Sequence, residues 1–322
     1  MSRTLTKSEK NRGGEIYDVV IVGGGPAGLT AGLYASRARL NTLLLEGISV
    51  GGQMMTTDIV ENYPGFPQGI SGADLTAIME EHAKRFGLMT EMGEVIGLEL
   101  TSGEKLVKTV DREYRAEAII ICTGTEYRKL GIPGEAKFTG RGVSYCATCD
   151  GAFFKDNKIV VVGGGDSALT EALFLTKFAK EITIIHRRDA LRATKIYQER
   201  AFSNPKINFL WNSVVEEIKG NQTVESILVK NVTSGEVSEV PTEGVFMFVG
   251  IEPKTAFLRG VVELDESGYI LVDENNLQTS VDGIFAAGDA RKKMLRQVAT
   301  AVGDGATAAF AVEKYLEERE NT

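Results

Sequence analysis

Two glycine-rich turns constrain the fold of this 322-residue chain more than any other feature. Each lies between a short apolar run and a helix-forming run, at Gly23–Gly28 and at Gly163–Ala168. The pattern G-x-G-x-x-G, with alanine permitted at its last position, lets the backbone approach a pyrophosphate at a helix N-terminus. The two turns start 140 residues apart and indicate an internal duplication of one nucleotide-binding architecture.

The first turn lies between an expected strand at 17–22 and an expected helix at 29–40. The next expected strand, 41–45, is followed by Glu46. An acidic side chain there can hold a pair of ribose hydroxyls and would repel a 2′-phosphate, so the first site suits FAD or NAD. Glycine-rich turns also serve structure alone, which is the alternative interpretation.

The second turn follows an expected strand at 158–162 and precedes an expected helix at 169–178. The strand after it, 181–185, ends in the basic segment His186–Arg192. Arginines bind a 2′-phosphate through charge-assisted, often bidentate hydrogen bonds, which favours NADPH over NADH. The alternative is a solvated basic turn.

Cys146 and Cys149 form a Cys-x-x-Cys pair between the two turns. Such a pair can close a reducible ring. Zinc would need two further ligands, and Cys122, His82 and His186 do not have ligand-like spacing, so no metal is expected. Cys122 follows an apolar run and is expected to be a small buried residue at a strand end. Three cysteines without a spaced framework favour a reducing compartment, and hence the cytoplasm.

Composition limits the remaining possibilities. The length suggests two domains. A net charge of −8 offers no general attraction to nucleic acid or to anionic membranes. No apolar run reaches the roughly 18 residues that span a bilayer. Residues 1–15 are polar and are expected to be disordered.

Several further segments join these features into a family signature. They are Gly51-Gly52-Gln53, Glu61–Gly65, Thr123-Gly124, Arg141–Gly151, Ala286–Asp289 and Arg296-Gln297-Val298. From about residue 17 to 316 the chain resembles the low-molecular-weight thioredoxin reductases of bacteria and archaea, class II pyridine nucleotide-disulfide oxidoreductases. A Cys-x-x-Cys just before the second turn distinguishes this family from glutathione-reductase-like flavoproteins.

The resemblance implies an α/β fold with two Rossmann-like, three-layer ββα dinucleotide-binding domains. A discontinuous FAD domain would comprise residues 1–125 and 255–322. The NADPH domain, 126–254, would be inserted into it and would carry the cysteines. Thr123-Gly124 and 250–254 would then be crossing segments, and both contain a glycine able to act in a hinge.

The resemblance also assigns the cofactor residues. FAD would be bound by Gly23, Gly25, Pro26, Ala27, Gly28, Glu46, Gly51, Gly52, Gln53, Thr57, Asn62, Thr123, Gly124, Gly288, Asp289, Arg296, Gln297 and Val298. NADPH would be bound by Gly163, Gly165, Asp166, Ser167, Ala168, His186, Arg187, Arg188 and Arg192. The last long helix, opened by 296–298, would direct its positive end toward the flavin edge that becomes negative on reduction.

The implied reaction passes electrons from NADPH through FAD to the Cys146–Cys149 disulfide and then to thioredoxin. In the family, Cys149 faces the flavin and Cys146 attacks the substrate disulfide. A position at a helix start would lower the thiolate pKa. Asp150 would supply and remove the proton, or alternatively would only cap a helix. The family also implies a homodimer and rotation of the NADPH domain during turnover.

Phe153 and Phe154 follow the redox motif and form either a thioredoxin docking patch or part of the core. Arg141 would add a charge at its rim. The chain departs from the family pattern at Thr170 and Cys122, where only tuning is expected. It also departs at Met54 and Met55, near the flavin, where a change in the solvent access or potential of the flavin is expected.

Other functions fit less well. A dithiol oxidase of the same fold tends to lose the nicotinamide site, and the arginines argue against it. Peroxiredoxin-reducing flavoproteins carry an additional N-terminal module. A ferredoxin–NADP reductase would lack the cysteines, and a non-catalytic nucleotide-binding module needs no thiols. A reductase of another disulfide protein remains an alternative.

Overall fold

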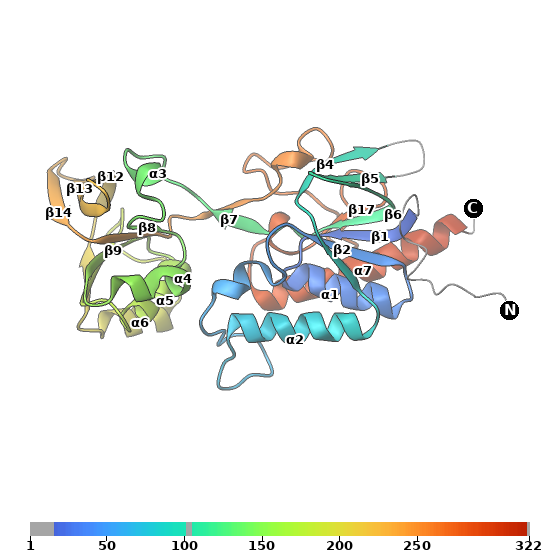
Figure 1. The fold of residues 1–322 in the computed structure, drawn as a ribbon, viewed down its shortest axis with the longest axis horizontal. Coiled ribbons are helices and arrows are strands. Elements are labelled where there is room, and N and C mark those ends of the chain that lie inside the picture. The colour runs from blue at the N-terminus through green and yellow to red at the C-terminus, as the bar shows by residue number, and fades with distance from the viewer. Residues whose placement is uncertain (1–15, 101–104, 321–322) are drawn as a thin grey trace. The chain divides into compact units, whose positions relative to one another are not determined.

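The computed structural model describes residues 16–100 and 105–320. The chain divides into two compact units (Figure 1): unit 1 comprises Met1–Glu126 and Pro253–Thr322, and unit 2 comprises Tyr127–Glu252. The segment 1–15, expected to be disordered, lies outside the described residues. Within the described ranges, no helix is both long enough and apolar enough to cross a membrane.

Unit 1 is built on a seven-stranded mixed sheet. Its strands are β1 (Ile16–Val22), β2 (Thr42–Glu46), β3 (Met89–Met92), β4 (Val95–Leu100), β5 (Lys105–Thr109), β6 (Glu113–Ile121) and β17 (Ile284–Ala286). They are ordered β3-β2-β1-β6-β5-β4, with β17 beside the last residues of β6. The strands β3, β2, β1, β6 and β17 are parallel, and β4 and β5 extend the sheet in antiparallel fashion.

The helices of unit 1 cover one face of this sheet. They are α1 (Pro26–Arg37), α2 (Gly72–Arg85) and α7 (Val298–Glu320). Unit 1 also has the short 3₁₀ turns η2 (Gly52–Thr56), η4 (Ala256–Leu258) and η5 (Gly288–Ala290), of which η4 packs into the core of the opposite face through Leu258. In β1, Val19 and Ile21 face the helices, whereas Val20 and Val22 join the core on the opposite face. Burial on both faces explains why the residues of β1 from Val19 to Val22 are continuously apolar instead of alternating.

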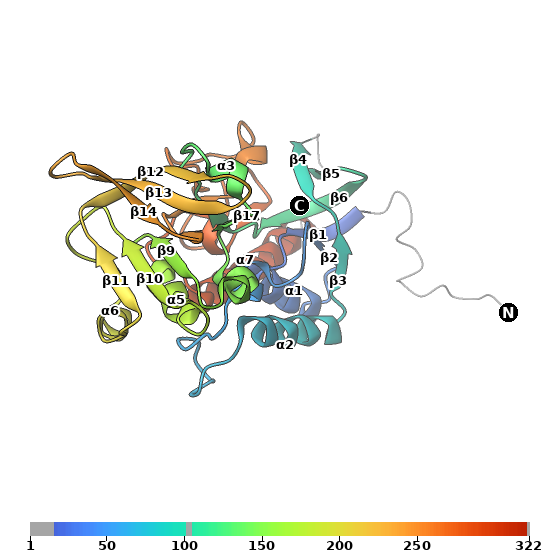
Figure 2. The ribbon, with the colours of Figure 1, turned by 60° about the vertical axis from the view of Figure 1, so that its left-hand side comes forward.

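Unit 2 has three layers (Figure 2). The central layer is a parallel sheet of β8 (Val143–Ser144), β9 (Lys158–Val162), β10 (Glu181–Ile185), β11 (Ile207–Leu210) and β15 (Gly244–Met247), ordered β11-β10-β9-β15-β8. One face carries α5 (Asp166–Leu175) and α6 (Lys195–Phe202). The other carries the antiparallel strands β12 (Ser213–Gly220), β13 (Val224–Asn231) and β14 (Val237–Pro241). Short helices α3 (Glu135–Phe138) and α4 (Ala147–Asp150) and the turn η3 (Gly151–Phe154) precede β9. The predicted α/β architecture with parallel sheets is confirmed.

The sequence placed both fingerprint helices three residues too late. They begin at Pro26 and Asp166, directly after Gly25 and Gly165, which are their N-caps. The last residues of each glycine pattern therefore belong to the helix itself. Proline is accepted in the first turn because the N–H that it lacks would have no intrahelical partner there.

Two strands carry the chain between the units. They are β7 (Thr125–Tyr127) and β16 (Ile251–Pro253), which pair as a two-stranded sheet. A glycine lies beside each strand: Gly124 has φ +66° and Gly250 has φ +131°. Both values fall in the left-handed region that favours glycine. A hinge at these glycines stays a prediction.

Candidate redox site and nucleotide-binding turns

Cys146 and Cys149 form the expected disulfide in unit 2, with their Cα atoms 5.4 Å apart. The pair lies at the start of α4, where Cys146 is the N-cap residue. The sulfur of Cys146 accepts a hydrogen bond from the backbone N–H of Cys149 (3.1 Å) and lies 3.4 Å from the hydroxyl oxygen of Thr148. The N–H of Cys149 would therefore stabilise a negative charge on the sulfur of Cys146.

The segment before Cys146 is held by buried polar groups that the sequence did not reveal. Ser144 Oγ accepts from the Cys146 N–H at 3.0 Å and donates to the Cys146 carbonyl at 3.1 Å. The hydroxyl of Tyr145 donates to Glu135 Oε1 at 2.7 Å, and Glu135 is only 3% exposed. Burial and the hydrogen bond to this carboxylate raise the pKa of Tyr145. Hydrogen bonds of Ser144 and Tyr145 thus hold the chain in place just before Cys146.

Asp150 is the last residue of α4 and precedes η3. Its backbone N–H donates to the Cys146 carbonyl at 3.2 Å. Its side chain makes no capping hydrogen bond to η3. The helix-cap interpretation therefore lacks its defining contact, and the acid role stays a prediction.

The two phenylalanines after the redox motif have opposite environments. Phe153 is 81% exposed, whereas Phe154 is 9% exposed. The ring of Phe154 packs edge-on against Phe246, with their centroids 5.1 Å apart. The core interpretation is therefore correct for Phe154, and Phe153 alone is free to contact a partner.

The first glycine turn is tightly packed at two positions and open at the third. At Gly23, whose φ is +106°, an added Cβ would lie 2.4 Å from the carbonyl oxygen of Cys122. At Gly28 it would lie 1.9 Å from the carbonyl oxygen of Gly23. A Cβ at Gly25 would meet nothing within 4 Å. Packing thus requires glycine at 23 and 28, while Gly25 leaves space where a ligand can approach the start of α1. Cys122 is 6% exposed, as expected.

Glu46 lies at the end of β2, beside this turn. One carboxylate oxygen accepts from the Gly24 N–H at 2.7 Å, and the other accepts from Gly47 N–H and Ile48 N–H at 2.8 and 3.1 Å. A carboxylate offers about four acceptor sites, so these bonds orient Glu46 and leave it able to accept one more. Its ribose role stays a prediction.

Segments predicted for the flavin side meet although they are far apart in sequence. The Gly51 N–H donates to the Gly24 carbonyl at 2.8 Å, which joins the Gly51-Gly52 loop to the first turn. Asn62 Nδ2 donates to Gln297 Oε1 at 2.8 Å. Gln53 Nε2 donates to Thr125 Oγ1 at 3.1 Å.

The other residues predicted for this side take these positions. Thr57 follows η2, Gly288 and Asp289 lie in η5, Val298 begins α7, and the guanidinium carbon of Arg296 lies 4.0 Å from the ring centroid of Tyr269.

The second glycine turn repeats the geometry of the first. A Cβ at Gly163 (φ +147°) would lie 2.4 Å from the carbonyl oxygen of Phe248, and Gly165 is open. Ala168 is fully buried where the first turn has glycine, and Ser167 is exposed. Asp166, at the start of α5, accepts from the backbone N–H of Thr194 at 2.5 Å and from its hydroxyl at 3.0 Å.

The basic segment after β10 is fastened to this turn. The Arg192 N–H donates to the Gly164 carbonyl at 2.8 Å. The ring of His186 packs on Gly164 so closely that a Cβ there would lie 2.4 Å from Nδ1. Burial, followed by the charge of Arg192, lowers the pKa of His186. The side chains of Arg187, Arg188 and Arg192 are exposed. An arginine-lined surface therefore adjoins the second turn.

Four predicted cofactor residues contain buried polar atoms without a hydrogen-bond partner. They are Thr123 Oγ1, His186 Nε2, Asp289 Oδ1 and Arg296 Nε. Such atoms are rare in native proteins unless a ligand or water completes them. Burial also raises the pKa of Asp289. These donors and acceptors fit FAD in unit 1 and a pyridine nucleotide in unit 2.

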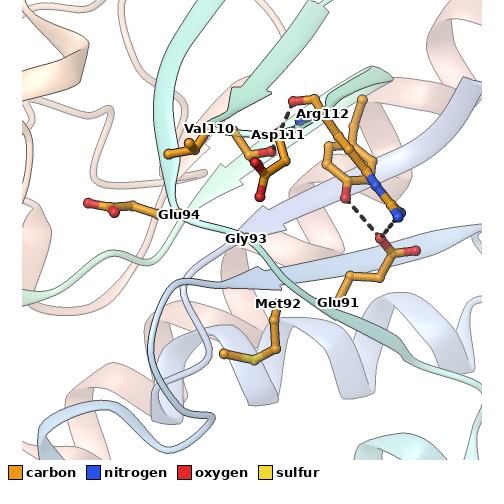
Figure 3. A pocket seen from close by; sticks show the side chains of 9 residues that line it. Glu91, Met92, Gly93, Glu94, Val110, Asp111 and Arg112 are labelled. Carbon is orange, nitrogen blue, oxygen red and sulfur yellow. Dashed lines mark hydrogen bonds and ion pairs between the residues drawn. The ribbon is translucent and has the colours of Figure 1, made fainter.

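A separate hollow of about 440 Å³ lies in unit 1 between β3 and the turn before β6 (Figure 3). None of the predicted site residues lines it. The Tyr114 hydroxyl donates to Glu91 Oε2 at 2.8 Å, and Arg112 lies 3.5 Å from the same oxygen (Figure 3). Three polar side chains of the hollow, Glu91, Arg112 and Tyr114, thus contact one another. In the described part of the chain, no three His, Cys, Asp or Glu side chains gather as metal ligands.

Comparison with known proteins identifies the family of the chain. Residues 17–305 match the pyridine nucleotide-disulphide oxidoreductase family, to which the chain belongs. Its relatives include thioredoxin reductases of Peptoclostridium litorale (52% identical; 94% of this chain and 98% of the relative) and Bacillus subtilis (50%; 96% and 97%). The crystal structure of Lactococcus lactis thioredoxin reductase has a TM-score of 0.91 at 48% identity, covering 94% of this chain and 99% of its own.

Within that family, the chain is a member of the low-molecular-weight thioredoxin reductases. The resemblance predicted from the sequence is confirmed. The chain is a flavoprotein oxidoreductase of a class that uses FAD and NADPH.

Proposed function

We propose that this enzyme reduces the disulfide of thioredoxin with electrons from NADPH. Unit 1 binds FAD, and unit 2 binds NADPH and carries the redox disulfide. The observation that carries the proposal is the Cys146–Cys149 disulfide in the same compact unit as the arginine-flanked second turn. A donor site and a reducible bond in one chain define a disulfide reductase.

The chain's own residues supply the cofactor sites. FAD, when bound, provides a two-electron carrier between the nicotinamide and the disulfide. In unit 1 the open Gly25, the carboxylate of Glu46 and the unpartnered Asp289 Oδ1 bind it. In unit 2 the open Gly165 and the exposed arginines of the basic segment bind the phosphates of NADPH.

The dithiol form performs the exchange with the partner. The Cys146 thiolate attacks one sulfur of the partner's disulfide, and the other sulfur leaves as a thiolate. Cys149 then attacks Cys146 Sγ in the mixed disulfide, which reforms Cys146–Cys149 and releases the partner with both cysteines reduced. The Cys149 N–H and Thr148 hydroxyl beside Cys146 Sγ support Cys146 as the attacking sulfur. Asp150 exchanges the proton with the departing thiolate.

Exposed residues support the remaining proposals. Phe153 is the apolar contact for thioredoxin, with Arg141, also exposed, at its rim. The enzyme acts in the cytoplasm. It forms a homodimer through unit 1, where the apolar residues Tyr34, Ile78 and Phe310 are 46%, 52% and 57% exposed. Sedimentation analysis that finds only monomer at micromolar concentration would contradict the dimer.

Anaerobic mixing tests the function directly. The flavin absorbance should bleach rapidly with NADPH and much more slowly with NADH. Addition of oxidised thioredoxin should then restore the colour while thiols appear on thioredoxin. Bleaching that thioredoxin does not reverse would point to another disulfide partner. No bleaching with either nicotinamide would refute the NADPH assignment.

A further inference from the structure

Asp304 lies in α7 directly behind the turn η5, which carries Asp289. It is 9% exposed. Its Oδ2 accepts the backbone N–H of Gly288 at 3.0 Å, so the helix is hydrogen-bonded to the residue immediately before Asp289. A carboxylate this deeply buried requires compensation by several donors.

Two cations supply that compensation. Arg291 binds Asp304 with both ends of its guanidinium, Nε to Oδ2 at 2.9 Å and Nη2 to Oδ1 at 3.0 Å. Lys293 Nζ lies 2.7 Å from Oδ2. The side chains of Arg291 and Lys293 are only 9% and 6% exposed, so both charges depend on neighbouring anions. Arg291 has a second such anion, the exposed Glu274, at 3.0 Å.

Asp289 stands beside this cluster but lacks the same support. Its Oδ1 is buried and has no hydrogen-bond partner. Burial raises its pKa, while the charges of Lys293 and Arg296 pull the pKa down. Lys293 is thus close enough to act on Asp289, yet its ammonium contacts Asp304.

We propose that Asp304 is a positioning residue of the flavin-nucleotide site: by binding Arg291, Lys293 and the Gly288 amide, it keeps Asp289 free to accept a hydroxyl of the ligand. This inference rests on the proposed binding of FAD in unit 1. Asp304 itself does not contact the ligand. It acts by taking up Lys293, which would otherwise form an ion pair with Asp289.

Loss of the Asp304 charge should let Lys293 compete with the ligand for Asp289. A buried cation left without its anion is strongly unfavourable, so it moves to the nearest remaining carboxylate. Asp289 is within reach of Lys293, because the charge of Lys293 already lowers the pKa of Asp289. An Asp289–Lys293 pair would occupy the acceptor that FAD needs. Removal of Lys293 in the same protein should therefore restore binding.

FAD titration of the apoprotein, followed by quenching of flavin fluorescence, tests this prediction. Asp304→Asn should raise the Kd by ~10- to 100-fold. Asp304→Asn combined with Lys293→Met should return the Kd to within about threefold of the original. Glu317→Gln is the matched control, because it neutralises an exposed carboxylate on the same helix, and its Kd should not change.

The second substitution separates positioning from simple loss of structure. If Asp304→Asn binds FAD as tightly as the original, or if Lys293→Met gives no rescue, the inference is wrong. If Asp304→Asn does not fold, the double variant decides, since its cluster has lost one charge of each sign and should fold and bind FAD. An original apoprotein that binds no FAD would overturn the proposed function itself.

Discussion

Replacement of Phe154 by alanine should destabilise unit 2 severely. The ring lies in the core with Ile159, Ala147 and Phe246, and its edge contact with Phe246 spans 5.1 Å between centroids. Phe154 also fills the space over Gly244, where an added Cβ would lie 2.4 Å from the ring. Loss of a buried phenylalanine that cannot be replaced by its neighbours costs about 3–5 kcal/mol of unfolding free energy.

Replacement of the adjacent Phe153 should have the opposite profile. With 81% of its surface exposed, it contributes within about 0.5 kcal/mol to stability. If thioredoxin covers the ring, the lost burial is about 1.5–3 kcal/mol, which corresponds to a ~10- to 100-fold higher KM for thioredoxin. The turnover of a small aromatic disulfide, which needs no docking surface, should not change.

Urea unfolding followed by circular dichroism measures the first effect, and steady-state kinetics with thioredoxin and with the small disulfide measures the second. Phe202→Ala provides the control, because Phe202 is another exposed phenylalanine of unit 2, with 55% of its surface exposed. It should leave the KM for thioredoxin unchanged. Equal losses with both substrates for Phe153→Ala, or unchanged stability for Phe154→Ala, would refute the division of roles between these neighbours.

Three further results are expected. Gly25→Ala should fold but lose FAD, since its Cβ meets nothing within 4 Å of the protein. Gly28→Ala should not fold, because its Cβ would lie 1.9 Å from a carbonyl oxygen. Melting curves with and without FAD distinguish the two variants. Replacement of Arg187 and Arg188 together by alanine should raise the KM for NADPH ~10- to 100-fold and leave that for NADH nearly unchanged, as initial rates would show. Burial raises the pKa of Tyr114 from 10.0 to about 12. The stability that this shift contributes is present below pH 10 and should be lost as the pH rises toward 12. Tyr114→Phe should remove that part of the loss, as urea titrations at several pH values would show.

The parts of the fold that the sequence predicts are those that local backbone chemistry decides. The strands β9 and β10 occur at the residues expected, because each is a β-branched run bounded by a turn. The glycines at 23 and 163 have positive φ, and the sequence showed them through their spacing. The helices begin earlier than the sequence predicts because the last residues of each glycine pattern form the first helical turn.

The sequence does not predict the environment of a single side chain where tertiary packing decides it. Phe153 and Phe154 are chemically identical neighbours, and only the turn η3 determines which of them meets Phe246. Glu135 precedes Tyr145 by ten residues and shows no motif, yet it is buried against the hydroxyl of that tyrosine. The segment around it, Gly134-Glu135-Ala136-Lys137, offers no signal that this acid is buried.

Asp304 shows how a stretch that reads as plain packing acquires a role at the site. The sequence around it, Gly303 to Ala309, is rich in small residues and predicts only close contact between helices. The structure shows that contact: at Gly305 an added Cβ would lie 2.2 Å from the Ala27 carbonyl of α1. This approach brings α7 against the fingerprint helix and buries the neighbouring carboxylate behind η5. A larger residue at Gly305 would therefore push Asp304 away from Gly288 and free Lys293, with a loss of FAD affinity like that of Asp304→Asn.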